Sequence, residues 1–194
     1  MSFLTGTNTE LIYVSKSAGT AKNTFTTEVL INDTAGMGVQ AHLPADFWLP
    51  NNTSAGKAIR IVARGILSST GTPTYTFTIR GGAAGAITGA ILIGSAAVTT
   101  GSSVTNQFWE LDGTFSLTAI GAAGANSSGN GIGCIINTGL SASIIPIYGG
   151  GVTPGTVTTL DTSITNFINF NVACNVSSVS NTITLQQLEV YGLN

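Results

Sequence analysis

The sequence is short of charge. It has six Lys and Arg and eight Asp and Glu, which is 7% of 194 residues, where a typical soluble domain has about 25%. A surface of this kind steers charged ligands poorly and offers few groups for acid–base chemistry. Thr, Ser, Asn and Gly must instead form most of the surface that faces water. The composition therefore favours an assembly component over an enzyme.

Basic clusters and long apolar runs are also missing. The net charge is −2, and the few basic residues are scattered, which argues against a nucleic-acid partner. No stretch reaches 18 consecutive apolar residues, so we expect no membrane span and no membrane partner. The first residues lack the basic and apolar regions of a signal peptide. We therefore expect synthesis in the cytoplasm.

Cysteine and histidine are too rare to build a common metal or nucleophile site. Cys134 and Cys174 lack metal-ligand spacing, and we predict two free buried thiols, with a strand-to-strand disulfide as the alternative. His42 is the single histidine, and no Gly-x-Ser-x-Gly motif accompanies it. A structural or surface role is the simpler interpretation of His42. We expect no catalytic residue, no cofactor and no metal site.

Two acidic residues stand out beside a tryptophan. Glu110 and Asp112 lie two residues apart next to Trp109, as paired acids of a sugar-hydrolysing or sugar-binding cleft would. The same alternation is typical of an ordinary exposed strand face, which we favour. With so few charges, cross-strand ion pairs would set register between strands or subunits. The expected pairs join Arg60, Arg64 or Arg80 to Glu110, Asp112 or Asp161.

Alternation of apolar and polar residues with period two dominates the chain and predicts an antiparallel β-sandwich. The clearest strands are expected over residues 59–64, 74–80, 109–119, 164–175 and 181–191, and others over 10–15, 25–31, 38–43, 90–97 and 132–137. Asn169 and Asn171 fall on the polar face of their strand. A change of phase near Gln186 and Gln187 predicts a β-bulge. Residues 44–50 favour one helical turn, and 126–131 favour a loop.

The first 35 residues alternate less clearly than the rest and are rich in Thr and Asn. We predict that residues 1–35 form an extended N-terminal arm that orders against a neighbour. Residues 36–194 then form the β-sandwich domain.

Several segments resemble a pattern found in tailed-bacteriophage virion proteins. They are residues 43–47 (LPADF), 56–65 (GKAIRIVARG), 70–77 (TGTPTYTF), 108–111 (FWEL) and 180–190 (SNTITLQQLEV). The resemblance implies a jelly-roll-like antiparallel β-sandwich, often trimeric, on the outside of the head or on the tail. It carries no catalytic residues, and residues 121–159 fit it least.

The resemblance and the composition together predict a non-enzymatic virion structural protein. We expect a capsid decoration (cement) protein on the outer capsid surface, made in the host cytoplasm, that binds the major capsid protein as a homotrimer, with residues 1–35 as its anchor. The alternative is a tail or head-fibre module that binds a host receptor or glycan, using Trp48, Trp109 and Tyr148. A shell-forming capsid subunit is a third possibility.

Overall fold

The computed structural model describes residues 9–45, 47–48, 57–121, 126–151 and 155–193. Within these residues thirteen strands form one antiparallel sheet, in the order β1-β13-β4-β8-β9-β10-β6-β5-β12-β2, with β11, β3 and β7 paired at its margins. The elements are β1 (Thr9–Val14), β2 (Val29–Leu30), α1 (Thr34–Met37), β3 (His42–Leu43), β4 (Ala58–Ser69), β5 (Thr74–Gly82), β6 (Ala90–Ser95), β7 (Val98–Thr99), β8 (Val104–Ala119), β9 (Ser127–Asn137), β10 (Ile144–Tyr148), β11 (Thr156–Leu160), β12 (Asn166–Cys174) and β13 (Thr182–Leu193).

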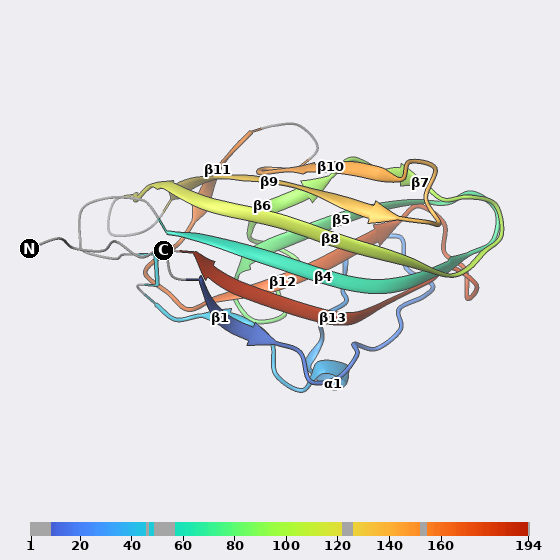
Figure 1. Ribbon diagram of the computed structural model, residues 1–194, viewed down its shortest axis with the longest axis horizontal. Coiled ribbons are helices and arrows are strands. Elements are labelled where there is room, and N and C mark those ends of the chain that lie inside the picture. The colour runs from blue at the N-terminus through green and yellow to red at the C-terminus, as the bar shows by residue number, and fades with distance from the viewer. Residues whose placement is uncertain (1–8, 46, 49–56, 122–125, 152–154, 194) are drawn as a thin grey trace, which may run out of the picture.

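The sheet folds over on itself into two layers. The front layer in Figure 1 holds β1, β13, β4, β8 and β9, and the back layer holds β6, β5 and β12. Strand β2 extends the back layer by pairing with β12. Strand β10 joins the layers because it pairs with both β9 and β6. Trp109 of β8 crosses this interior to meet Phe170 of β12 edge to face, with ring centroids 5.6 Å apart, and Phe77 of β5 at 5.7 Å. The predicted all-β antiparallel sandwich is confirmed.

The strands with the clearest alternation are confirmed, and β13 has its bulge between Leu185 and Gln187. The loop predicted over residues 126–131 is wrong, since β9 begins at Ser127. Its glycines let two backbones approach closely: a Cβ on Gly131 would lie 2.2 Å from the Leu92 carbonyl oxygen of β6. The short helix α1 was not predicted; Asp33 caps it by accepting from the Gly36 N–H.

The segment predicted as an arm contacts the chain's own sandwich wherever it is described. Strand β1 pairs with β13, and the Gly19 N–H then donates to the Leu185 carbonyl of β13. The chain next crosses to the back layer, where β2 and β3 pair with β12. We call residues 15–43 the covering segment. Residues 1–8 lie outside the described residues, and anchoring on a neighbour stays a prediction.

Candidate functional site

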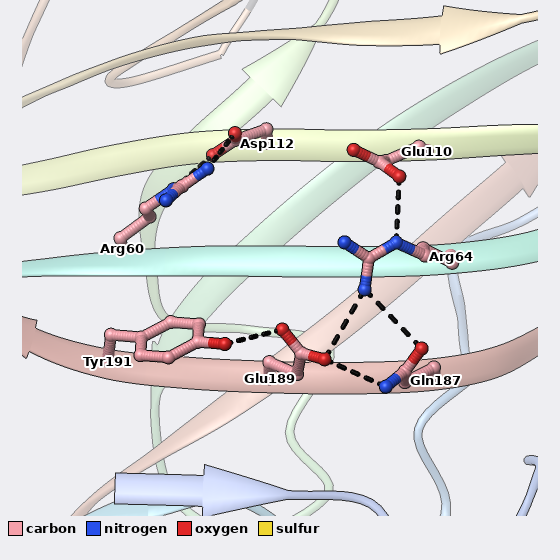
Figure 2. Close-up of polar contacts among 7 residues, drawn as sticks. All are labelled: Arg60, Arg64, Glu110, Asp112, Gln187, Glu189 and Tyr191. Carbon is pink, nitrogen blue, oxygen red and sulfur yellow. Dashed lines mark hydrogen bonds and ion pairs between the residues drawn. The ribbon is translucent and has the colours of Figure 1, made fainter. Parts of the chain in front are cut away.

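The outer face of β13, β4, β8, β9 and β10, called the open face below, carries most of the chain's charge network (Figure 2). Arg60 of β4 binds Asp112 of β8 through two hydrogen bonds, of 2.8 Å from Nε and 2.5 Å from Nη2. Arg64 donates to Glu110 at 2.7 Å. Of the predicted combinations, Arg60 with Asp112 and Arg64 with Glu110 are therefore observed, within one chain.

The network continues onto β13. Arg64 also reaches Glu189 at 3.3 Å, and Glu189 accepts 2.7 Å hydrogen bonds from Gln187 Nε2 and the Tyr191 hydroxyl. The bond to Glu189 raises the pKa of Tyr191 above its ordinary value. Hydrogen bonds to Glu110 and Asp112 likewise raise the pKa of Arg64 and Arg60. All three carboxylates in the network thus have hydrogen-bond partners.

The ion pairs cover an apolar residue. Val62 lies in register between Asp112 and Glu189, yet its exposed fraction is only 3%. The arginine and carboxylate side chains around it remove it from water, as long charged side chains can. Exposed ion pairs are each worth about 0–1 kcal/mol, so this network orders the surface more than it stabilises the fold.

Beside the network the open face becomes apolar. Ile136 of β9 pairs directly with Ile144 of β10 and with Glu110 of β8. Ile132 is 68% exposed and Ile144 is 65% exposed, and Ile136 and Phe108 are also exposed. We call Phe108, Ile132, Ile136 and Ile144 the apolar patch. Exposed aliphatic residues that gather on one sheet face make this patch a candidate contact surface.

The outer face of the back layer is covered instead. Asn169 and Asn171 of β12 are fully buried, although their strand pattern predicted a polar, wetted face. Gln40 of the covering segment donates to the Asn169 side chain at 2.5 Å and accepts from the Gly85 N–H. Amide side chains face one another here because a second segment of chain replaces the solvent.

The third arginine belongs to this covered face. Arg80 of β5 pairs with Glu28 of the covering segment through two nitrogens, at 3.0 and 3.1 Å, and Glu28 also accepts from Thr78. The predicted partners of Arg80 were wrong, because no alternation pattern placed Glu28 over β5. Asp161 instead accepts from Ser163, which lowers its pKa.

Two of the three aromatic residues proposed for sugar binding are inaccessible to a ligand. Trp48 and Trp109 are fully buried, packed edge to face against Phe115 and Phe170 respectively. Tyr148 is half-buried at the end of β10. His42 is exposed, with its ring 5.4 Å from that of Phe167.

The two cysteines are both free. Cys174 is buried in β12, whereas Cys134 is half-buried and paired in register with Asp112 of the open face. They stand in different layers, and Cys134 is less enclosed than the sequence predicted. Of the alternatives left open, free thiols are the one observed.

Two hollows lie outside the charge network. One, of about 450 Å³, lies between β1 and the end of α1, and its lining includes Ile12, Tyr13, Met37 and Val39. The other, of about 240 Å³, is lined by Thr26, Thr74, Thr76, Ala97, Ala173, Cys174 and Asn175. Glu110 and Asp112 line neither of these hollows.

Within the described residues, no three His, Cys, Asp or Glu side chains gather closely enough to hold a metal ion. The same part of the chain contains no helix that is long and apolar enough to cross a membrane.

Comparison with known proteins leaves the chain without a family. No family model matches it, and no curated protein matches it. Its likeness to the following two solved structures is weak. The CBM2 module of the evolved Dit protein of Lactobacillus casei BL23 phage J-1 has a TM-score of 0.27 and 11% identity, over 89% of this chain and 99% of that one. A legume lectin-like domain from Entamoeba histolytica has a TM-score of 0.20 and 13% identity, over 91% and 90%. TM-scores this low do not establish a shared fold.

Proposed function

We propose that this chain is a non-enzymatic virion structural protein, a capsid decoration or cement protein that binds the major capsid protein on the outer head surface. The apolar patch is the observation that carries the proposal. Ile132, Ile136 and Ile144 are exposed together on a sheet face beside fully paired charges. Such a surface has little net charge to repel a protein neighbour. Its burial against a partner is favourable because water leaves the apolar side chains.

The mechanism is adhesive. Each copy contributes a modest apolar contact, and many copies on one lattice raise the barrier to separating the subunits below them. The low overall charge supports this role, because a protein packed against neighbours needs few solvated charges. The homotrimer expected from the resemblance stays a prediction.

The test uses purified virions depleted of this protein and reconstituted with the full chain. We expect stoichiometric binding and a higher temperature of genome release, followed with a DNA-binding dye. The double substitution Ile132→Ser and Ile144→Ser should weaken binding at least about tenfold, given two large exposed aliphatic side chains. The matched control, Ile87→Ser and Val179→Ser, removes exposed apolar residues outside the patch. Unchanged binding by the patch variant would overturn the proposal.

A second candidate function is recognition of a host glycan, and the hollow on the back layer favours it. Thr26, Thr74, Thr76 and Asn175 line this hollow with neutral hydroxyl and amide groups, which suit sugar hydroxyls. A glycan array probed with the isolated protein tests this directly. A signal that Thr76→Val abolishes, while Thr114→Val on the open face retains it, would favour receptor binding. An array without signal would remove this candidate.

A further inference from the structure

The larger of the two hollows lies between β1 and the end of α1, and Figure 1 shows α1 just beyond the end of β1. Its volume of about 450 Å³ is within the range of about 300–1,000 Å³ that small-molecule sites occupy. Met37 at its inner end is buried in the core, whereas Val14 and Val39 are 43% and 63% exposed. The hollow therefore runs from an open rim down to the apolar interior.

Several of the hydrogen-bonding groups around this hollow already have partners. The Tyr13 hydroxyl donates to the Val39 carbonyl at 2.7 Å, and the Ser17 hydroxyl donates to the Gly36 carbonyl at 2.6 Å. The backbone N–H groups of residues 37–39 also donate to backbone carbonyls. A ligand rich in hydroxyl groups, such as a sugar, therefore gains little here, in contrast to the hollow lined by threonines.

One charged side chain, that of Lys16, lines the hollow. Lys16 is exposed and has no ion-pair partner among the described residues, whereas Lys22 and all three arginines have one. None of the described residues that line the hollow is acidic. The hollow thus combines an apolar wall with one positive charge that the fold leaves free. This combination is complementary to an anionic group attached to an apolar chain.

We propose that this hollow binds a small amphiphilic carboxylate, with its apolar chain against Met37 and Val39 and its carboxylate on the Lys16 ammonium. Such a charge-assisted hydrogen bond is about twice as strong as one between neutral groups, and it fixes which end of the ligand faces the solvent. The bound chain contacts both β1 and the covering segment, so it stabilises the folded protein. No residue of the apolar patch lines the hollow, and the site is therefore separate from the proposed capsid contact.

Isothermal titration calorimetry of the full chain with octanoate tests the site. We expect saturable binding at a single site, and an unfolding temperature that rises with the octanoate concentration. Octanol has the same chain length without the charge, and it should bind at least about tenfold more weakly. Added salt should weaken the binding of octanoate, because Lys16 is exposed.

Two variants with matched controls examine the two halves of the site. Lys16→Gln should weaken octanoate binding about tenfold, whereas Lys57→Gln, which removes the same charge outside the hollow, should leave it unchanged. Val39→Glu should abolish binding because it places an acid at the rim. Val179→Glu makes the same change at an exposed valine elsewhere and should have no effect. The replaced hollow residues are both exposed, so the variants should fold, as circular dichroism can check.

The absence of saturable octanoate binding, or octanoate binding that Lys16→Gln leaves unchanged, would overturn the proposal. Equal affinity for octanol would also overturn it, since the hollow would then accept any apolar group, such as a side chain of a partner protein. Failure here is distinguishable from failure of the capsid function. Lys16→Gln should bind depleted virions as well as the natural chain does if the apolar patch makes that contact.

Discussion

The two outer faces of this sandwich are built from similar alternating strands, but one is covered by protein and the other is exposed to solvent. On the back layer, Asn169 and Asn171 are buried beneath side chains of the covering segment and its neighbours. On the front layer, Ile132 and Ile144 remain in water. Alternation shows which residues point away from the core. It does not show whether water or another piece of protein meets them.

The same contrast applies to charge. The Arg80 and Glu28 side chains on the covered face are 15% and 22% exposed, while those of Arg60 and Asp112 on the open face are 48% and 34% exposed. The two pairs have similar hydrogen-bond geometry. Their solvent exposure therefore decides how much each pair stabilises the fold, and variants of each pair can measure the difference in stability.

Breaking the attachment of the covering segment should have the largest effect. The Asn32 side chain donates to the Ile168 carbonyl and accepts from the Phe170 N–H, and it is buried. Asn32→Ala leaves both backbone groups without this partner, and we expect a loss of about 2–4 kcal/mol in the free energy of unfolding. Urea denaturation measures it. Asn23→Ala, at an exposed position of the same segment, should cost about 0.5 kcal/mol or less; equal losses would contradict the covering role.

The next largest effect should be the difference in stability between variants of the two ion pairs. Arg80→Met leaves Glu28 without its ion-pair partner on the covered face, and we expect a loss of about 2 kcal/mol. Arg60→Met on the open face should cost at most about 0.5 kcal/mol, because solvent already screens that pair. Thermal unfolding in low and high salt compares them. Only the Arg60 pair should be sensitive to salt; equal sensitivity would mean that Arg80 is wetted too.

Acid should loosen the covering segment through Asp33. Burial raises the pKa of Asp33, but hydrogen bonds from Lys22 and the Gly36 N–H outweigh it and leave the pKa below its ordinary value. Ionised Asp33 therefore stabilises the folded chain at neutral pH, and this contribution disappears as the pH falls below about 4. Asp33→Asn keeps an acceptor for the helix cap and removes the charge. We expect it to be about 1 kcal/mol less stable than the natural chain at neutral pH.

The free energy of unfolding of the natural chain and of Asp33→Asn, measured across pH, checks the direction of this effect. The difference between them should shrink on acidification. A gap that stays constant down to the lowest accessible pH would mean that the Asp33 charge contributes nothing.

The apolar patch should have the smallest effect on stability. Ile132→Ser and Ile144→Ser remove side chains that are mostly in water already, so the free energy of unfolding should change by about 0.5 kcal/mol or less. Chemical denaturation of the isolated chain measures it. A loss of several kcal/mol would show that the patch is part of the fold's own packing, and that it is not available to a partner.

The sequence predicts the sandwich well and its coverings poorly. Strands such as β5 and β13 alternate cleanly because one face of each meets the core, and the bulge in β13 appears as a change of phase. Opposite charges on neighbouring strands predicted the Arg60 and Arg64 pairs. The covering segment has no such period, because its strands are only two residues long and its buried apolar residues, such as Phe25, Ile31 and Met37, are irregularly spaced. Glu28 and Gln40 therefore carried no signal of their contacts.

The accessibility of the aromatic residues was also predicted wrongly. Trp109 lies beside two acids in the sequence, but period two sends it to the opposite side of β8, where it fills the space above Gly65. A Cβ on Gly65 would lie 2.5 Å from the Trp109 ring. The apolar patch escaped notice for a related reason, since isoleucine in a glycine-rich strand indicates a core residue by composition alone.

Electron cryo-microscopy of intact virions, with symmetry imposed, tests the central claim most directly. The account predicts density for this chain on the outer capsid lattice, with Ile132, Ile136 and Ile144 against the shell. Density confined to the tail tip or to sparse fibres, or a lattice contact made without the apolar patch, would contradict it.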